Sequence, residues 1–175
     1  MAVWLRPWRP DDAAALTALW QTDDALHRQF PVPLSSEADA REHLERQSSR
    51  VDVIDWALDD GAGVIGSVTA SNLEYRHDTA WMSYWLRASA RGSGLATRAL
   101  ATLSDYCFGE GMHRLELGHR VDNPASCTVA SRAGYLVEGV ERGKLRYGVD
   151  RHDVERHARL VSDPRPDVAP LPVQL

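Results

Sequence analysis

Apolar and polar residues alternate along several stretches of the chain and recur at helical spacing along others. Between residues 11 and 20, the apolar positions Ala15, Leu16, Leu19 and Trp20 share one helical face. Where apolar residues alternate with polar ones between turn-forming residues, a strand is the better prediction. The pattern predicts strands at 2–8, 51–58, 64–73, 78–87, 113–118, 135–140 and 144–159.

Helices are expected in the intervals between these strands. One opens at Asp11 and another at Ser35-Ser36, where favoured cap residues precede acidic side chains. A third follows the glycines near residue 94 and ends at Gly109, and a fourth begins at Asn123-Pro124 and ends before Gly134. The order is strand, two helices, three strands, helix, strand, helix and two strands, which predicts an α/β (α+β) fold.

Length and composition fit one globular domain. The chain has 175 residues, of which 43% are hydrophobic and 26% charged. We expect a domain at 1–161, followed by a proline-rich tail at 162–175 that is extended or disordered. There is no apolar run of the roughly 20 residues that a membrane helix needs, and residues 1–6 lack a secretory apolar segment. A cytoplasmic protein with no membrane partner is the expectation.

Charge and cysteine content narrow the class further. The formal net charge of −5 argues against sequence-independent nucleic-acid binding, which needs a dense basic surface. Cys107 and Cys127 both fall on predicted helices, so two free thiols are expected rather than a disulfide.

The segment 91–97 lies between a predicted strand, 81–86, and a long amphipathic helix. Its glycines allow a sharp turn and a close approach of the backbone to a ligand, and the free N–H groups of the helix start favour an anion such as pyrophosphate. A nucleotide P-loop is excluded because Leu95-Ala96, not lysine, follows the last glycine. A dinucleotide fingerprint is disfavoured by Thr97, while a loop without a ligand stays open. The candidate cofactor-binding residues are Arg91, Gly92, Ser93, Gly94, Leu95, Ala96 and Thr97.

The order Arg91-x-x-Gly94-x-Ala96, late in the chain and behind a strand, resembles the acyl-coenzyme A signature of the GNAT superfamily of N-acetyltransferases. The order of elements is similar to the GNAT layout over roughly residues 2–160. The resemblance implies a mixed, mostly antiparallel sheet of about seven strands with helices on both faces. It also implies acetyl-CoA as the acyl donor.

A second set of motifs resembles the GNAT branch that acetylates the N-termini of ribosomal proteins. It consists of residues 113–117, Asn123-Pro124-Ala125-Ser126 and Ala133-Gly134-Tyr135. The implied activity is direct transfer of acetyl, in a ternary complex, to a primary amine, with an N-terminal α-amine as the best candidate. Three alternatives stay open: a small-molecule amine such as a polyamine or an antibiotic, another acyl-CoA, and a non-catalytic CoA-binding sensor or partner-binding module.

The resemblance assigns roles to individual residues. It places the backbone at Leu86 and Ala88 beside the acetyl and pantetheine groups, with an N–H available to the developing oxyanion. Strand alternation puts Glu116 on the face opposite Leu115, where it is the candidate base, unless it pairs with a cross-strand arginine. Ala130 stands where many GNAT enzymes have a tyrosine acid, so Ser126 would stabilise the thiolate. The remaining candidates are Asn123, as helix cap and pantetheine contact, and Arg91 and Arg132, as phosphate contacts.

Other residues give weaker signals. A metal is not expected, because His152 and His157 would face opposite sides of a strand and His113 and His119 lack a third ligand. Cys127 with His119 could form an acyl-accepting pair, although packing in the helix is the simpler interpretation. By analogy with the family, the acceptor is selected by residues 21–36 and 142–144, and edge strands leave a homodimer open.

Overall fold

Seven strands form one sheet in the computed structural model, which describes residues 2–175. Their order across the sheet is β1-β2-β3-β4-β5-β7-β6, and every neighbouring pair is antiparallel except β4 and β5. The mixed, mostly antiparallel sheet predicted from the sequence is therefore confirmed. The strands are β1 (Trp4–Pro7), β2 (Val53–Asp59), β3 (Val64–Glu74), β4 (Thr79–Leu86), β5 (Arg114–Arg120), β6 (Leu136–Tyr147) and β7 (Asp150–Leu160).

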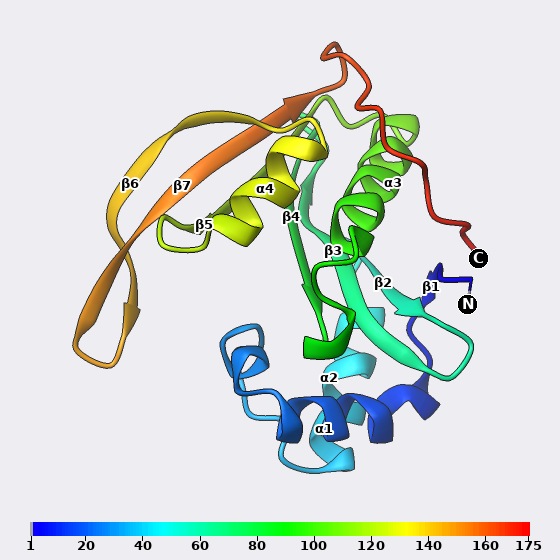
Figure 1. Cartoon of the computed structure of the whole chain (residues 1–175). Coiled ribbons are helices and arrows are strands. Elements are labelled where there is room, and N and C mark those ends of the chain that lie inside the picture. Colours follow the sequence, from blue (N-terminus) through cyan, green and yellow to red (C-terminus); the bar gives the residue numbers. More distant parts are fainter. Residues whose placement is uncertain (1) are drawn as a thin grey trace.

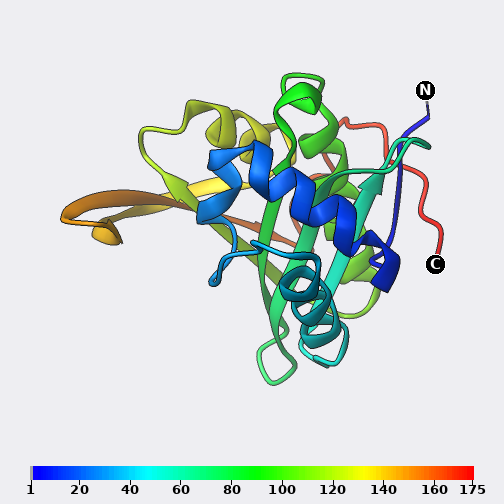
Figure 2. The same ribbon diagram turned by 90° about the horizontal axis from the view of Figure 1, so that it is seen from below.

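Helices cover the sheet on two sides (Figure 1; Figure 2). The larger core cluster joins the sheet to α3 and α4, and a second cluster lies under α1 and α2, with Trp85 of β4 against it. Within residues 2–175, none of the helices is both long and apolar enough to cross a membrane. The helices are α1 (Ala13–Thr22), α2 (Glu37–Ser48), α3 (Leu95–Gly109) and α4 (Pro124–Arg132), with short 3₁₀ turns η1 (Pro10–Asp12), η2 (Asp24–Arg28) and η3 (Ala88–Ala90).

The sheet opens between β4 and β5. These two parallel strands pair only from Thr79 to Trp81, against Arg114 to Glu116. Beyond that point, Met82 to Leu86 remain paired with β3, while Leu117 to Arg120 remain paired with β7. The free ends of β4 and β5 therefore diverge, and α4 follows β5 directly beside the opening (Figure 1). A parallel pair that separates in this way leaves backbone and side chains available to a ligand.

The last two strands differ from the prediction. The sequence placed a turn near residues 142–144 and a strand from 144 onward, whereas β6 continues to Tyr147 and the chain turns at Gly148-Val149. The register between β6 and β7 shifts between Glu141 and Leu145, so residues 142–144 form an irregularity within the hairpin and not its end. β6 is an edge strand and largely exposed. Its sequence therefore lacks the alternation of apolar and polar residues that marks a half-buried strand, and the pattern does not show where the strand ends.

Residues 162–175, for which the sequence left an extended or a disordered segment open, run back beside β1 (Figure 1). The amide of Leu5 donates to the carbonyl of Pro172 at 2.8 Å, and the amide of Gln174 donates to the carbonyl of Leu5 at 2.9 Å. Leu171 is buried in the main core, and its amide donates to the hydroxyl of Thr102 on α3. The segment thus packs as an extended strap across α3 and the sheet edge.

Candidate functional site

Two cavities lie in the opening between β4 and β5 and share part of their walls. The larger has a volume of about 500 Å³ and the smaller about 310 Å³. Both are lined by Tyr84 of β4, by Asn123 and Ser126 at the start of α4, and by Ala25 and Gln29 of the η2 segment. Two ligands, one in each cavity, would therefore meet at Tyr84 and Ser126.

The smaller cavity contains part of the predicted glycine segment. Leu86, Arg91, Gly92 and Ala96 line it, and the first bond of the α3 ladder is donated by Arg98 to the carbonyl of Gly94. Backbone N–H groups before Arg98 therefore precede the ladder and are available to a ligand. Of the other predicted contacts, Ser93 donates to the carbonyl of Ala90 at 2.6 Å and Thr97 is buried, while Leu95 packs against the main core.

Gly92 and Gly94 have left-handed backbone conformations, with φ of +75° and +79°. A Cβ atom at either position would meet no protein atom within 4 Å. The glycines are therefore needed for the backbone conformation and leave open space above the loop, which is what the sequence argument for an anion site requires.

Arg91 is held in place by the protein itself. Its Nε donates to the carbonyl of Leu86 at 2.9 Å, and its guanidinium forms an ion pair with Asp23, just before η2. Arg91 thereby joins the glycine loop to the segment that covers both cavities. A phosphate group of a ligand that contacts Arg91 would therefore share its guanidinium with the Asp23 carboxylate.

The start of α4 has the predicted capping arrangement. The side chain of Asn123 accepts a hydrogen bond from the amide of Ser126 at 3.2 Å, and Pro124 occupies the first helical position. Both Asn123 and Ser126 line the cavities, so both are available to a ligand there.

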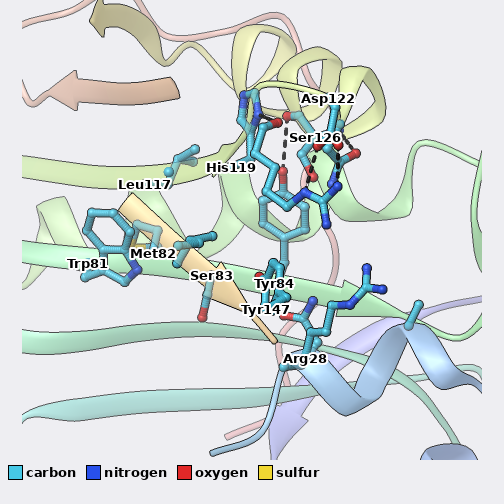
Figure 3. A pocket seen from close by; sticks show the side chains of 16 residues that line it. Arg28, Trp81, Met82, Ser83, Tyr84, Leu117, His119, Asp122, Ser126 and Tyr147 are labelled. Atoms are coloured by element: carbon cyan, nitrogen blue, oxygen red, sulfur yellow. Dashed lines mark hydrogen bonds and ion pairs between the residues drawn. The ribbon is translucent and has the colours of Figure 1, made fainter. Parts of the chain in front are cut away.

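Tyr84 is a site residue that the sequence analysis missed. Its hydroxyl donates to the backbone carbonyl of Ser126 at 3.2 Å and links β4 to α4 (Figure 3). Burial raises the pKa of Tyr84 to about 12, so the phenol stays protonated and remains a hydrogen-bond donor. The signal was present in the strand pattern, because Met82, Tyr84 and Leu86 alternate on the face that packs against α3 and α4.

The larger cavity is closed on one side by stacked cationic and aromatic side chains. The guanidinium carbons of Arg28 and Arg120 lie 5.3 Å and 5.5 Å from the centre of the Tyr147 ring. This stacking joins η2 and β5 to the β6–β7 hairpin (Figure 3). In the cavity wall formed by residues 2–175, Asp122 is the only acidic side chain, and it is ion-paired with Arg120.

Glu116, the candidate base, is held by two arginines. One carboxylate oxygen accepts from Arg114 Nε at 2.6 Å, and the other accepts from Arg156 at 2.8 Å. The walls that residues 2–175 give to the two cavities do not include Glu116. The alternative interpretation, a strand glutamate paired with cross-strand arginine, describes its surroundings.

Two further candidates lie outside both cavities. Ala88 is the exposed first residue of η3, and Arg132 is exposed in the last turn of α4, at the opposite end of that helix from Ser126. At about 1.5 Å per residue, six residues of helix separate Arg132 from Ser126 by roughly 9 Å. Contact with either residue would require a ligand that extends beyond the smaller cavity.

The surroundings of Cys127 do not favour a role as nucleophile. Its Sγ lies 3.5 Å from a carboxylate oxygen of Glu155, and burial together with that carboxylate raises the pKa of the thiol. A raised pKa disfavours the thiolate that acyl acceptance needs. Cys107 is buried in the core, whereas Cys127 is only half-buried, and both are free thiols as predicted.

His119 has neighbouring donor side chains that the sequence did not indicate. His119 lies beside His157, Glu155 and Cys127, and the donor atoms of these four residues are within 4.8 Å of one another. The sequence did not reveal this group because β7, which carries two of the residues, follows β5 by more than thirty positions.

Comparisons with known proteins give the family and the fold. A family model described as an acetyltransferase (GNAT) domain matches residues 2–136. The ribosomal-protein-serine acetyltransferase of Escherichia coli (strain K12) is 32% identical over 99 residues, which cover 56% of this chain and 55% of that protein. The chain spans about half the length, or less, of the curated relatives it matches.

Solved structures are similar over nearly the whole chain. RimL, described as a ribosomal-protein α-N-acetyltransferase in complex with coenzyme A, is 25% identical, with a TM-score of 0.84 over 92% of this chain and 95% of that one. A spermidine N-acetyltransferase from Vibrio cholerae, in complex with CoA and spermine, is 21% identical, with a TM-score of 0.81 over 92% of this chain and 96% of that one. The likeness to the spermidine enzyme shows a shared fold and does not distinguish the acceptors.

Proposed function

Because the chain belongs to the GNAT acetyltransferase family, we propose that it transfers the acetyl group of acetyl-CoA directly to a primary amine, with a protein N-terminal α-amine as the acceptor. The observation that carries this proposal is the shared wall of the two cavities at Tyr84 and Ser126. A donor in one cavity and an acceptor in the other would meet there, which is the arrangement that direct transfer needs.

The donor fits the smaller cavity. Its left-handed glycine loop and the amides before Arg98 suit a pyrophosphate, and its apolar wall, which includes Leu86 and Val129, suits the pantetheine arm. The thioester would then point toward Asn123 and Ser126. Coenzyme A is also the ligand in the similar RimL structure.

The chemistry needs little from ionisable side chains. The neutral amine attacks the thioester carbonyl, the C–S bond breaks, the amine proton leaves to water, and CoA departs as a thiolate. The Ser126 hydroxyl would stabilise that thiolate by a hydrogen bond, since a serine is too weak an acid to protonate it fully. Tyr84 fixes the Ser126 backbone and keeps α4 in register with β4.

The basic groups on the wall of the larger cavity are already engaged, which favours an α-amine over a lysine. His119 lines this cavity, but its Nδ1 lies 2.9 Å from the carbonyl of Arg120 and its Nε2 lies 2.9 Å from Nε2 of His157. Within residues 2–175, the only carboxylate on the wall of the larger cavity is already paired with Arg120. An α-amine has a reference pKa of about 8, against about 10.4 for lysine, so a usable fraction is neutral near physiological pH without a strong base. The name of the E. coli relative, a ribosomal-protein-serine acetyltransferase, is consistent with such an acceptor.

A polyamine is the second candidate, because a spermidine enzyme shares the fold. The charges of the larger cavity count against it. Arg28 and Arg120 stand on the wall with a single carboxylate from residues 2–175, Asp122, which pairs with Arg120, so a substrate with several ammonium groups would meet a net positive wall. A peptide N-terminus carries one amine and then a neutral backbone, so it meets less repulsion.

A thiol-release assay with acetyl-CoA and a panel of amines tests the proposal. We expect turnover with short peptides that begin with serine or alanine, and none with the same peptides blocked at the α-amine. Turnover with spermidine but not with peptides would favour the second candidate. Tight CoA binding with no turnover across the panel would identify a non-catalytic CoA-binding protein and overturn both.

A further inference from the structure

Beneath the start of α4, four side chains that could ligate a metal converge from three elements. His119 comes from β5, Glu155 and His157 come from β7, and Cys127 comes from α4. The Nε2 atom of His157 lies 2.9 Å from Nε2 of His119 and 3.0 Å from Oε1 of Glu155. That Glu155 oxygen lies 3.5 Å from both His119 Nε2 and Cys127 Sγ.

We propose that this cluster is a zinc site with a Cys-His₂-Glu ligand set. Zinc takes four ligands in a tetrahedron, at about 2.0–2.2 Å from nitrogen or oxygen and about 2.3 Å from sulfur, so its ligand atoms stand roughly 3.3–3.8 Å apart. The four contacts of 2.9–3.5 Å between the donor atoms need to expand by only a few tenths of an ångström to reach that spacing. The two remaining pairs, from Cys127 Sγ to each histidine, lie within 4.8 Å, so the thiol would move toward the histidines by up to about 1 Å.

The histidines are already oriented as ligands. Nδ1 of His119 lies 2.9 Å from the carbonyl of Arg120 and donates to it, because a carbonyl only accepts. In the neutral ring this leaves a lone pair on Nε2, directed at the cluster, and a backbone carbonyl behind the ring is a common support for a ligating histidine. His157 also makes its polar contacts through Nε2, while its buried Nδ1 has no hydrogen-bond partner among residues 2–175, so His119 alone has such a support behind the ring.

Without a metal, these contacts are poorly satisfied. A neutral His157 has at most one proton on Nε2, and it would have to serve both the Nε2 lone pair of His119 and the carboxylate of Glu155. His157 is 1% exposed and His119 8%, so water offers little help. A metal ion accepts electron pairs from all four atoms at once.

Glu155 also differs from the carboxylates around it. Glu116, Glu138 and Glu141 each form an ion pair with an arginine of the same region of the sheet. Glu155, in the described part of the chain, has ionic contacts with His119 and His157 alone. One carboxylate and one thiolate would balance the two charges of Zn²⁺.

The donor set selects the metal and the role. A thiolate with two imidazoles favours zinc over magnesium or calcium, which prefer oxygen ligands. Four protein ligands close the coordination sphere, which is typical of a structural site. The metal would tie α4 to β5 and β7 next to Ser126 and so position the start of that helix. Binding would displace the Cys127 thiol proton to solvent.

Metal binding is measured directly on the whole chain, freed of any histidine tag and kept reduced. The protein is stripped with a chelator and titrated with Zn²⁺ against a chromophoric competitor, and in parallel with Co²⁺. We expect one metal per chain, a thiolate-to-cobalt charge-transfer band with visible bands of a tetrahedral site, and a higher midpoint of thermal unfolding for the zinc form.

Ligand and control variants decide between the cluster and adventitious binding. Cys127→Ser should remove the charge-transfer band, and His157→Gln should weaken zinc binding at least about 100-fold, since even changes behind a ligand cost 10–100-fold. Cys107→Ala and His113→Gln, which change the same residue types outside the cluster, should leave both unchanged. Circular dichroism of the apo forms checks that each variant folds.

Two results would overturn the site: failure of the folded wild type to bind one Zn²⁺ in competition with the indicator, or equal binding by wild type, Cys127→Ser and His157→Gln. Neither result depends on acetyl transfer. The protein could therefore fail to bind zinc and still be an acetyltransferase, and it could bind zinc without acetylating an amine.

Discussion

The hydroxyl of Tyr84 donates to the backbone carbonyl of Ser126 across the opening in the sheet, at 3.2 Å. Tyr84 lies on β4, the strand that leads to the glycine loop, and Ser126 lies in the first turn of α4. The bond therefore joins β4 to α4, and residues of both elements line the two cavities. It also helps to fix the distance between the thioester, which is expected to lie along β4, and the Ser126 hydroxyl, which is expected to donate a hydrogen bond to the thiolate.

Removing this bond should loosen α4 without changing the shape of the core. Tyr84→Phe leaves the Ser126 carbonyl without its donor, so we expect the free energy of unfolding to fall by about 1 kcal/mol and kcat to fall as well. Tyr75→Phe, at a tyrosine that is 64% exposed, should change neither. Urea denaturation and steady-state kinetics measure both quantities. An unchanged kcat in Tyr84→Phe would show that this bond does not organise the site.

Ser126→Ala should separate binding from turnover. The hydroxyl is expected to contact the departing thiolate and not the ground state of acetyl-CoA, so kcat should fall about 10- to 100-fold with little change in the affinity for the donor. Ser131→Ala, an exposed serine on the same helix, is the matched control. A parallel loss of donor affinity, measured by calorimetry, would assign Ser126 to binding instead.

Gly94→Ala should cost stability and donor affinity together. The backbone at Gly94 is left-handed, and an alanine there is less stable by about 1–2 kcal/mol. Any local change in φ also moves the amides expected to bind phosphate, so the affinity for acetyl-CoA should fall by at least about 10-fold. Gly109→Ala, where φ is not left-handed and no atom lies within 4 Å of the new Cβ, should leave the donor affinity unchanged and raise the stability by up to about 1 kcal/mol. Wild-type affinity in Gly94→Ala would remove the loop from the donor site.

Glu116→Gln should keep most of the activity. Its carboxylate is occupied by Arg114 and Arg156, so the expected effect is a stability loss of up to about 1 kcal/mol and a kcat within about 3-fold of wild type. A general base contributes about 10²- to 10⁴-fold. A fall in kcat of that size, in a variant that unfolds like wild type, would restore Glu116 as the base.

Local signals in the sequence predicted the parts of the site that neighbouring residues build. Asn123 and Pro124 predicted the start of α4, and Gly92 and Gly94 predicted the turn into α3, because caps and left-handed positions depend on a few adjacent residues. Ser126 was a candidate because of the family resemblance, and the structure brings it to the same cavity wall as Gly92.

Contacts between distant strands escaped the sequence analysis. Alternation along β5 predicted the face on which Glu116 lies. It could not predict the ion pair of Glu116 with Arg156, because Arg156 is 40 residues away on β7. His119 and His157 meet across the same strand pair, which is why the four-residue cluster was not anticipated. The end of β6 was misplaced because an exposed edge strand lacks an alternating apolar face.

Mass spectrometry of an acetylated acceptor tests the central claim most directly. The purified protein is incubated with acetyl-CoA that carries an isotope-labelled acetyl group and with a peptide that has both a free N-terminal serine and an internal lysine. We expect one labelled acetyl group on the α-amine and none on the lysine. An unmodified peptide would contradict the proposed N-terminal acetylation in either of two cases. In one, spermidine is acetylated under the same conditions; in the other, no amine is acetylated at all.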